Sequence, residues 1–413
     1  MSTYLILACF FGFLMAWGVG ANDVANAMGT SVGSKALTIK QAIVIATIFE
    51  FMGAFLAGGQ VTDTIRKGLL DVDSMGMDPN ILIMGMMASL LAAASWLIFA
   101  SKFGWPVSTS HTIVGAIVGF GAMNLGFAAV DWHKISYIAM SWVFSPILGG
   151  VLAYLLFSSI QKLILNKKSP FESAKRIVPF YMFAVGATVS SLTLVSGLDH
   201  LGVELSDGIA WVLSGVFGLI TVIIGKYFIN KIQHPTTKNL HIHYANVEKV
   251  FSILMLFTAC AMAFAHGSND VANAIGPLAA IEQLVDTGQI TANQPVPIWI
   301  LLLGSLGIVL GLVMYGHKVI ATVGSGITEL TPTRGFAATF AAALTVVMAS
   351  GTGLPISTTH TLVGAVLGIG LAKGISALNL NIIRTIFMSW MITLPAGALL
   401  SIIFFHCLKA VLG

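Results

Sequence analysis

The sequence predicts an all-α polytopic membrane protein, with about 12 transmembrane helices in two inverted repeats and broken or re-entrant segments at two repeated motifs. Three observations predict this fold: an apolar composition, apolar stretches of span length, and motifs that occur twice. Of the 413 residues, 57% are hydrophobic and only 9% are charged, against about 25% charged in typical soluble domains. A chain this apolar cannot cover a water-facing surface, which excludes a soluble enzyme.

Other classes of protein are excluded by what the composition lacks. The chain has no basic run and no low-complexity tract, so we expect no nucleic-acid partner. The three cysteines are far apart in sequence and fit neither a disulfide framework nor a metal site. No GxxxxGK[ST] motif occurs, so ATP does not drive the protein directly, and we expect no cofactor.

Twelve apolar stretches are candidates for membrane spans, because a helix needs about 20 mostly apolar residues to cross about 30 Å of hydrocarbon. They are residues 4–30, 38–59, 80–100, 106–123, 135–160, 177–197, 208–228, 249–275, 297–316, 335–350, 355–372 and 382–408. The first stretch lacks the basic region of a cleaved signal sequence, so we expect it to be retained.

Basic residues predict the orientation of these spans. Of the 20 lysines and arginines, only Arg66, Lys67, Lys134 and Lys409 fall in even-numbered loops or at the C-terminus. Cytoplasmic loops carry the excess of positive charge in membrane proteins. We therefore expect a multi-pass protein of the cell membrane, with its odd-numbered loops in the cytoplasm and both termini outside.

The chain repeats two motifs. Gly20-Ala-Asn-Asp-Val-Ala-Asn-Ala27 returns as Gly267-Ser-Asn-Asp-Val-Ala-Asn-Ala274, and Pro106-Val-Ser-Thr-Ser-His-Thr112 returns as Pro355-Ile-Ser-Thr-Thr-His-Thr361. The repeats divide the chain into a first repeat (1–160, spans 1–5), a connecting region with basic loops (161–248, spans 6–7) and a second repeat (249–413, spans 8–12). Each span of the second repeat comes seven spans after its equivalent, an odd offset, so the copies are inverted in the membrane. Inverted repeats place a binding site near the midplane and favour a transporter that works by alternating access.

Acidic residues within the spans indicate where such a site lies, because charge in hydrocarbon is costly and usually marks function. Two of them, Asp23 and Asp270, belong to the repeated motif and are flanked by asparagines at helical spacing. At about 1.5 Å per residue, both fall within roughly 10–15 Å of the midplane. Carboxylate and amide oxygens are hard ligands that suit a small cation. The residues of this predicted cation site are Asn22, Asp23, Asn26, Asn269, Asp270 and Asn273.

One structural alternative to the cation site stays open, and the glycines beside the motif bear on its ligands. The asparagines and aspartates could form a polar clamp between helices. The flanking glycines, Gly18, Gly20, Gly29 and Gly33 in the first copy and Gly276 with Pro277 in the second, are expected to loosen the helices and release backbone carbonyls as further ligands.

The second motif has the features of a helix N-terminus, with a proline followed by hydroxyl side chains. Unpaired backbone N–H groups and the positive end of the helix dipole bind anions such as phosphate or sulfate there. Ordinary N-capping is the structural alternative. A Ser–His nucleophile is disfavoured, because no acid partner or soluble scaffold accompanies it. The hydroxyls of the predicted anion site are Ser108, Thr109, Ser110, Ser357, Thr358 and Thr359.

Three other polar residues belong to neither predicted set of ligands. His111 and His360 are favoured as supports of the helix rather than as ligands. Glu50 has no acidic counterpart in the second copy. A third cation ligand, a proton site and a partner for a nearby donor are equally compatible with Glu50.

In this chain, GANDVANA and GSNDVANA are each followed by P-x-S-T-[ST]-H. This doubled motif pair resembles the inorganic phosphate transporter (PiT) family. The resemblance covers both repeats. It implies a secondary transporter of phosphate, coupled to sodium in one branch and to protons in another, with some relatives carrying sulfate. By position, it assigns the asparagines and aspartates to ion binding and the six hydroxyls to phosphate. The chain lacks the long central loop of eukaryotic members, which argues against a receptor role.

We therefore expect a symporter, not an enzyme, that imports phosphate together with sodium ions. The coupling ion is expected to be sodium because oxygen-rich sets suit it and because the segment from GANDVANA to Glu50 is similar to the sodium-coupled branch. A proton-coupled phosphate or sulfate symporter is the alternative, and a passive anion channel is a weaker one. The expected partners are phosphate, sodium and the lipid bilayer. The sequence leaves the stoichiometry and the oligomeric state open, a homodimer included.

Overall fold

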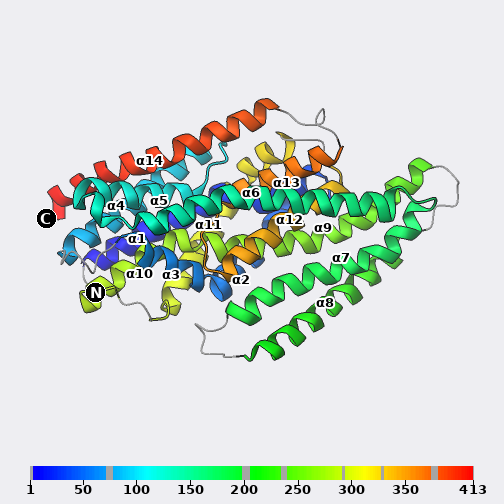
Figure 1. The fold of residues 1–413 in the computed structure, drawn as a ribbon, viewed down its shortest axis with the longest axis horizontal. Coiled ribbons are helices and arrows are strands. Elements are labelled where there is room, and N and C mark those ends of the chain that lie inside the picture. Colours follow the sequence, from blue (N-terminus) through cyan, green and yellow to red (C-terminus); the bar gives the residue numbers. More distant parts are fainter. Residues whose placement is uncertain are drawn as a thin grey trace.

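The computed structural model describes residues 3–70, 78–197, 205–233, 240–290, 294–326, 330–373 and 380–412, which are almost entirely helical (Figure 1). The helices are α1 (Thr3–Gly33), α2 (Ile39–Ala57), α3 (Gly59–Gly68), α4 (Pro79–Lys102), α5 (Thr109–Phe120), α6 (Trp132–Ile160), α7 (Pro170–Leu192), α8 (Asp207–Asn230), α9 (Leu240–Asp270), α10 (Ala272–Thr287), α11 (Ile298–Gly326), α12 (Pro332–Gly351), α13 (Thr358–Lys373) and α14 (Leu380–Leu412). Short helical turns are η1 (Gly121–Leu125), η2 (Phe127–Ala129), η3 (Gln161–Leu165) and η4 (Thr193–Gly197).

Ten helical stretches among the described residues are long and apolar enough to cross a membrane. This confirms the prediction of an all-α polytopic membrane protein. Two of the twelve predicted spans, 106–123 and 355–372, are instead the short helices α5 and α13, of 12 and 16 residues. They are short because the chain is not helical at 103–108 and 352–357, around the two motif prolines. These are the interrupted segments that the motifs predict.

The helix pairs α4–α5 and α12–α13 form two hairpins that turn in the same way. At the end of α4, the N–H of Gly104 donates to Ser101 and that of Trp105 donates to Ala100. At the end of α12, Gly353 and Leu354 repeat both bonds, to Ser350 and Ala349. This is the Schellman pattern, in which a residue in the left-handed conformation, most often a glycine, follows the helix. Gly104 and Gly353 have φ of 67° and 69°.

The two hairpins approach each other along the long axis of the molecule. Figure 1 shows α4 and α5 toward the end that holds the N- and C-termini, with α12 and α13 farther along. Their tips touch, because the Ser110 hydroxyl donates to the Ile356 carbonyl at 2.9 Å and that of Thr359 donates to the Val107 carbonyl at 3.3 Å. The chain of each hairpin therefore reverses direction at its contact with the other hairpin.

The motif glycines allow helices to cross closely. A Cβ atom on Gly20 would lie 1.9 Å from the carbonyl oxygen of Ile308 in α11, and one on Gly267 would lie 2.2 Å from that of Glu50 in α2. The expectation that glycines loosen the first motif helix is wrong, since α1 runs unbroken through it. In the second copy the helix is interrupted at Val271, between α9 and α10, while Gly276 and Pro277 lie within α10.

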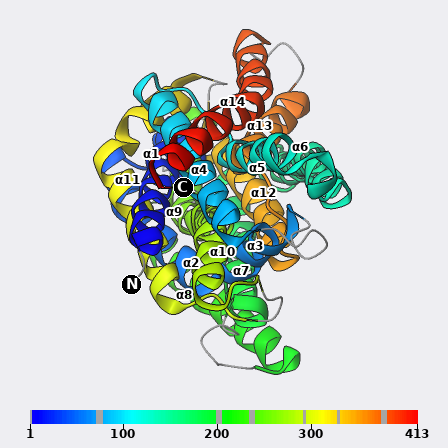
Figure 2. The ribbon, with the colours of Figure 1, turned by 90° about the vertical axis from the view of Figure 1, so that its left-hand side faces the viewer.

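The remaining helices surround this centre. α1 packs along α11, and α2 packs along α9. The helices α7 and α8 pack on each other and project from one side of the molecule, where α7 also contacts α9 (Figures 1 and 2). The core that holds the motifs is thus built from the first and second repeats together.

Candidate functional site

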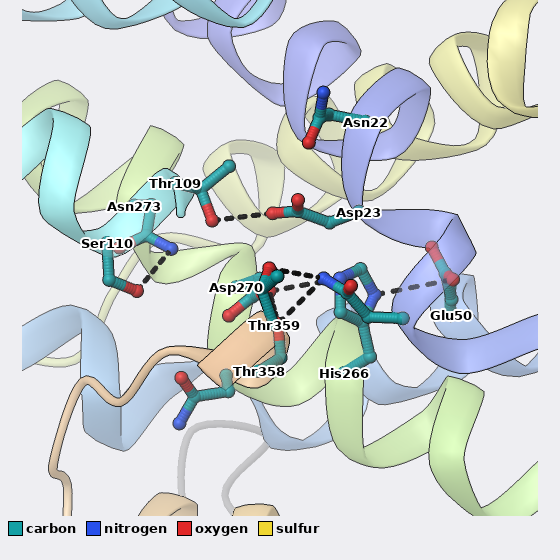
Figure 3. A network of polar contacts seen from close by, with 12 residues as sticks. Asn22, Asp23, Glu50, Thr109, Ser110, His266, Asp270, Asn273, Thr358 and Thr359 are labelled. Carbon is teal, nitrogen blue, oxygen red and sulfur yellow. Dashed lines mark hydrogen bonds and ion pairs between the residues drawn. The ribbon is translucent and has the colours of Figure 1, made fainter. Parts of the chain in front are cut away.

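The residues of both motifs lie in the buried centre of the protein. None of the twelve predicted cation-site and anion-site side chains is more than 3% exposed. The structure brings them together from α1, α5, α9, α10 and α13, although the two copies are far apart in sequence (Figure 3). A polar cluster of this size, buried in an otherwise apolar core, indicates a binding site.

Within each repeat, a threonine of the second motif hydrogen-bonds the aspartate of the first. The hydroxyl of Thr109 donates to Asp23 Oδ2 at 2.6 Å, and that of Thr358 donates to Asp270 Oδ2 at 2.8 Å (Figure 3). These equivalent bonds attach the first turn of α5 to α1 and that of α13 to α9. Each one places a carboxylate next to a helix N-terminus.

The first asparagine of each motif holds the tip of its own hairpin. Asn22 Nδ2 donates to the Ser101 hydroxyl at 3.1 Å and to the Trp105 carbonyl at 3.0 Å. Asn269 Nδ2 contacts Ser350 and the Leu354 carbonyl in the same way, at 3.1 and 3.2 Å. These contacts have the geometry of a polar clamp. Sequence reasoning missed the two serines, which end α4 and α12 at equivalent positions outside both motifs.

The second asparagine of each motif reaches into the other repeat. Asn26 Nδ2 donates to the Thr359 hydroxyl at 2.8 Å, and Asn273 Nδ2 donates to the Ser110 hydroxyl at 3.3 Å. The carbonyl contacts between the hairpin tips join the same two hydroxyls. We call the motif residues of one repeat a half-site. Residues of the two half-sites hydrogen-bond each other, so together they form one composite site.

Ser108 and Ser357 are the N-caps of α5 and α13. Their hydroxyl oxygens accept hydrogen bonds from the backbone N–H groups of His111 and His360, at 3.3 and 3.2 Å. The capping alternative therefore describes their oxygens correctly. A hydroxyl that accepts a bond still has its hydrogen to donate, so both serines can also present a donor to an anion.

Several buried oxygens of the site have no hydrogen-bond partner. They are Asp23 Oδ1, Asp270 Oδ1, Asn269 Oδ1 and Asn273 Oδ1. Buried polar atoms are almost always paired, and exceptions ask for an explanation such as a bound ion. A small hard cation would satisfy such oxygens, because carboxylate and amide oxygens are its preferred ligands.

His266 is a site residue that sequence reasoning missed. Its ring is fully buried between two acids, with Nδ1 3.3 Å from Glu50 Oε1 and Nε2 2.9 Å from Asp270 Oδ2 (Figure 3). The spacing His266–Asp270 is one helical turn, which was a detectable signal. Glu50 thus faces a ring nitrogen, which agrees with a role as partner of a nearby donor, while its two predicted ion-binding roles stay open.

Atoms of Asp23, His266 and Asp270 lie within 4.8 Å of one another, a spacing that could hold a metal ion. In this arrangement, however, both ring nitrogens of His266 face carboxylates. The ring therefore has no nitrogen directed at a metal, and only oxygens remain as ligands.

The imidazole rings of His111 and His360 lie outside this polar centre. Their centroids are 4.3 Å apart, and the ring of His111 packs on Trp142 at 3.9 Å. The three residues line a largely apolar cavity of about 830 Å³ between α6, α13 and α14, which neither Asp23 nor Asp270 lines. The packing agrees with a supporting role for the histidines.

Comparison with known proteins identifies the family. Residues 19–401 match the phosphate transporter family. The chain belongs to this family. The transporter is 53% identical to a putative phosphate permease of Haemophilus influenzae, over 97% of this chain and 96% of that protein. It is also 44% identical to inorganic phosphate transporter 2-1, chloroplastic, of Arabidopsis thaliana, over 95% of this chain and 70% of the relative.

A solved structure supports the same assignment. The transporter matches a chain described as the sodium-dependent phosphate transporter with a TM-score of 0.92 and 38% identity, over 100% of both chains. The protein is therefore a multi-pass membrane transporter of phosphate and not an enzyme, and the predicted family is confirmed.

Proposed function

We propose that the transporter imports phosphate across the cell membrane by symport with sodium ions, using alternating access around the composite site. One observation carries the proposal: two buried carboxylates, each with an oxygen that lacks a hydrogen-bond partner, lie beside the N-termini of α5 and α13. The similarity to a sodium-dependent phosphate transporter supports sodium as the coupling ion.

Phosphate would bind between the two hairpin tips. Two helix N-termini meet there, and each offers backbone N–H groups and the positive end of its dipole. The hydroxyl hydrogens of Ser108 and Ser357 add donors that carry no charge. The other predicted hydroxyls donate to carboxylates or tip carbonyls in this conformation. We expect them to turn toward the anion when it binds.

Sodium would bind to the oxygens of Asp23, Asp270 and the threonines beside them. Among the described residues, Arg66 is the one buried lysine or arginine, and it pairs with Asp63 on α3. Burial lowers the pKa of Arg66, and the carboxylates of Asp63 and Glu282 oppose this. No lysine or arginine therefore balances phosphate and two aspartates, and His266 already faces the carboxylates of Glu50 and Asp270. We therefore expect bound sodium ions to supply the positive charge.

Alternating access would break and remake the contacts between the hairpin tips. The tips meet through the hydroxyls of Ser110 and Thr359, which donate to two backbone carbonyls of the opposite tip. Asn22 and Asn269 hold each tip to its own repeat, so the two hairpins can separate as rigid units.

The deciding experiment is uptake of labelled phosphate into proteoliposomes, with sodium and pH gradients imposed separately. We expect accumulation against a phosphate gradient when sodium is imposed outside. Accumulation driven by a pH gradient alone would assign the coupling to protons, and equilibration without accumulation would indicate a channel. Labelled sulfate in the same vesicles checks the choice of anion, and we expect sulfate to be excluded.

The proposed orientation places both termini outside and the basic loops in the cytoplasm. The first residues of α1 and the last residues of α14 lie at the same end of the molecule, as Figure 1 shows. Cysteine replacements of Lys168 and Lys409 in a cysteine-free protein test the orientation with a membrane-impermeant reagent on intact cells. We expect labelling at 409 and none at 168, and the opposite result would invert the topology.

A further inference from the structure

The helix crossing that carries Asp270 differs from its equivalent at one buried pair. Gly267 of α9 meets the carbonyl of Glu50, and Gly20 of α1 meets that of Ile308, so Ile308 occupies the position equivalent to Glu50. One residue before each glycine stand His266 and Val19. All four side chains have 0% exposure. An ionisable pair, Glu50 and His266, in one half of the protein therefore replaces an apolar pair in the other.

The Glu50–His266 pair changes what surrounds the carboxylate of Asp270. Its Oδ2 faces two groups, the hydroxyl of Thr358 at 2.8 Å and Nε2 of His266 at 2.9 Å. The other ring nitrogen lies against Glu50, which fixes the direction of the ring. In the first copy, the hydroxyl of Thr109 is the one hydrogen-bond donor to Asp23 Oδ2 among the described residues, and Val19 offers no donor.

These contacts leave the two carboxylates with different capacity to bind a cation. A carboxylate has about four lone-pair positions on its two oxygens. Asp23 keeps Oδ1 and part of Oδ2 for a cation, whereas Asp270 keeps Oδ1 only. A threonine hydroxyl also presents an oxygen to the ion, but the edge of the imidazole ring presents none.

We propose that His266, held by Glu50, is a positioning residue that makes the two half-sites unequal, so that sodium binds more tightly at Asp23 than at Asp270. This inference rests on the proposed sodium symport. A first ion then binds at Asp23 from solution. The ion at Asp270 binds well only when the charge of phosphate has arrived beside it. The order of binding follows from one asymmetric pair in an otherwise repeated site.

Exchanging the pair for its apolar equivalent tests the inference. The double variant E50I/H266V gives the second half-site the residues of the first. Equilibrium binding of labelled sodium to the purified full-length transporter, without phosphate, should show two affinities at least about tenfold apart in the wild type. In E50I/H266V the weaker affinity should tighten by about tenfold and approach the stronger one. A binding curve identical to that of the wild type would show that the pair is only structural.

A matched control uses the opposite crossing. V19A/I308V trims the apolar pair without touching a polar group, and its sodium curve should not move. The assignment of affinities is checked with Asp23→Asn, which should remove the tight class, and Asp270→Asn, which should remove the weak one. The reverse assignment would overturn the inference.

His266→Gln covers the case in which the double variant does not fold. It keeps an amide donor near Asp270 but loses the second ring nitrogen that faces Glu50, so the weak affinity should tighten by less. No shift in this folded variant counts against the inference. Sodium-driven phosphate uptake by the wild type is measured in parallel. Its failure contradicts the proposed symport, whereas normal uptake with unchanged sodium curves contradicts the inference alone.

Discussion

The hydroxyl of Thr109 donates a 2.6 Å hydrogen bond to Oδ2 of Asp23, and this bond joins the second repeated motif to the first. Both side chains are buried. Hydrogen bonds to charged groups contribute about 1.5–3 kcal/mol. We expect the threonine oxygen to serve also as a ligand of a cation bound to this carboxylate.

Thr109→Val should therefore raise the sodium concentration for half-maximal phosphate uptake by at least about tenfold. Valine has nearly the same shape but removes the hydroxyl, and a loss of about 1.5 kcal/mol corresponds to about tenfold. Uptake into proteoliposomes over a range of sodium concentrations measures the effect. Thr358→Val should act in the same direction at Asp270.

Thr112→Val is the matched control for this prediction. Thr112 is buried in the same helix, but its hydroxyl donates to the Ser108 carbonyl one turn earlier. Its loss should leave the sodium dependence unchanged. Equal shifts in Thr109→Val and Thr112→Val would mean that the effect comes from α5 as a helix and not from the contact with Asp23.

The repeated sequence predicts most of the site, because duplication marks the polar residues that both halves need. It could not separate Asn22 from Asn26, which stand one turn apart on α1. They differ because the two hairpins meet α1 at successive turns, so that Asn22 contacts its own hairpin and Asn26 contacts the opposite one. Only the packing of the two repeats reveals this division.

His266 was missed by the sequence analysis because this residue is not duplicated. It has no counterpart in the first copy, and a search for repeated features passes over it. The count of predicted spans exceeded the ten long helices because α5 and α13 are as apolar as spans but begin at the motif turns. Hydropathy records how apolar a segment is, whereas the direction of the chain at Gly104 and Gly353 depends on backbone geometry.

The two motif aspartates should be essential for transport and dispensable for folding. Asp23→Asn and Asp270→Asn keep the size of the side chain and remove its charge. Asparagine can still accept the threonine hydroxyl through its amide oxygen, so the fold should be retained, although Asp270→Asn also loses the charge that faces His266. We expect phosphate uptake to fall below about a hundredth of the wild-type rate, while expression and gel-filtration behaviour are retained. Wild-type uptake by both variants would exclude these carboxylates from the cation site.

Gly20→Ala should destabilise the transporter, because the added Cβ would lie 1.9 Å from the Ile308 carbonyl oxygen. Backbone must move to make room, and overpacking of a core typically costs about 1–3 kcal/mol. Thermal unfolding of the purified protein should show a lower midpoint. Gly215→Ala in α8 is the control, since a Cβ there meets nothing within 4 Å. It should be neutral or stabilising by about 0.5–1 kcal/mol.

Equal sensitivity of the two glycines would contradict the close crossing of α1 and α11. Gly267→Ala provides a second test at the crossing of α9 and α2, where the distance would be 2.2 Å. A loss of stability at both motif glycines, with none at Gly215, would show that these glycines are required by helix packing.

Phosphate and sodium should bind with strong positive cooperativity, because bound sodium ions offset the negative charge that opposes phosphate. At neutral pH phosphate carries between one and two negative charges, and Asp23 and Asp270 add theirs within the same buried centre. The helix N-termini of α5 and α13 offer only about half a positive charge each. Linkage then requires each solute to raise the affinity for the other by the same factor, typically about 5- to 150-fold.

We expect replacement of sodium by choline at fixed pH to weaken phosphate binding at least about tenfold in calorimetry, and removal of phosphate to weaken sodium binding equally. Phosphate affinity that ignores the choline exchange but rises steeply on acidification would instead place protons on the two carboxylates.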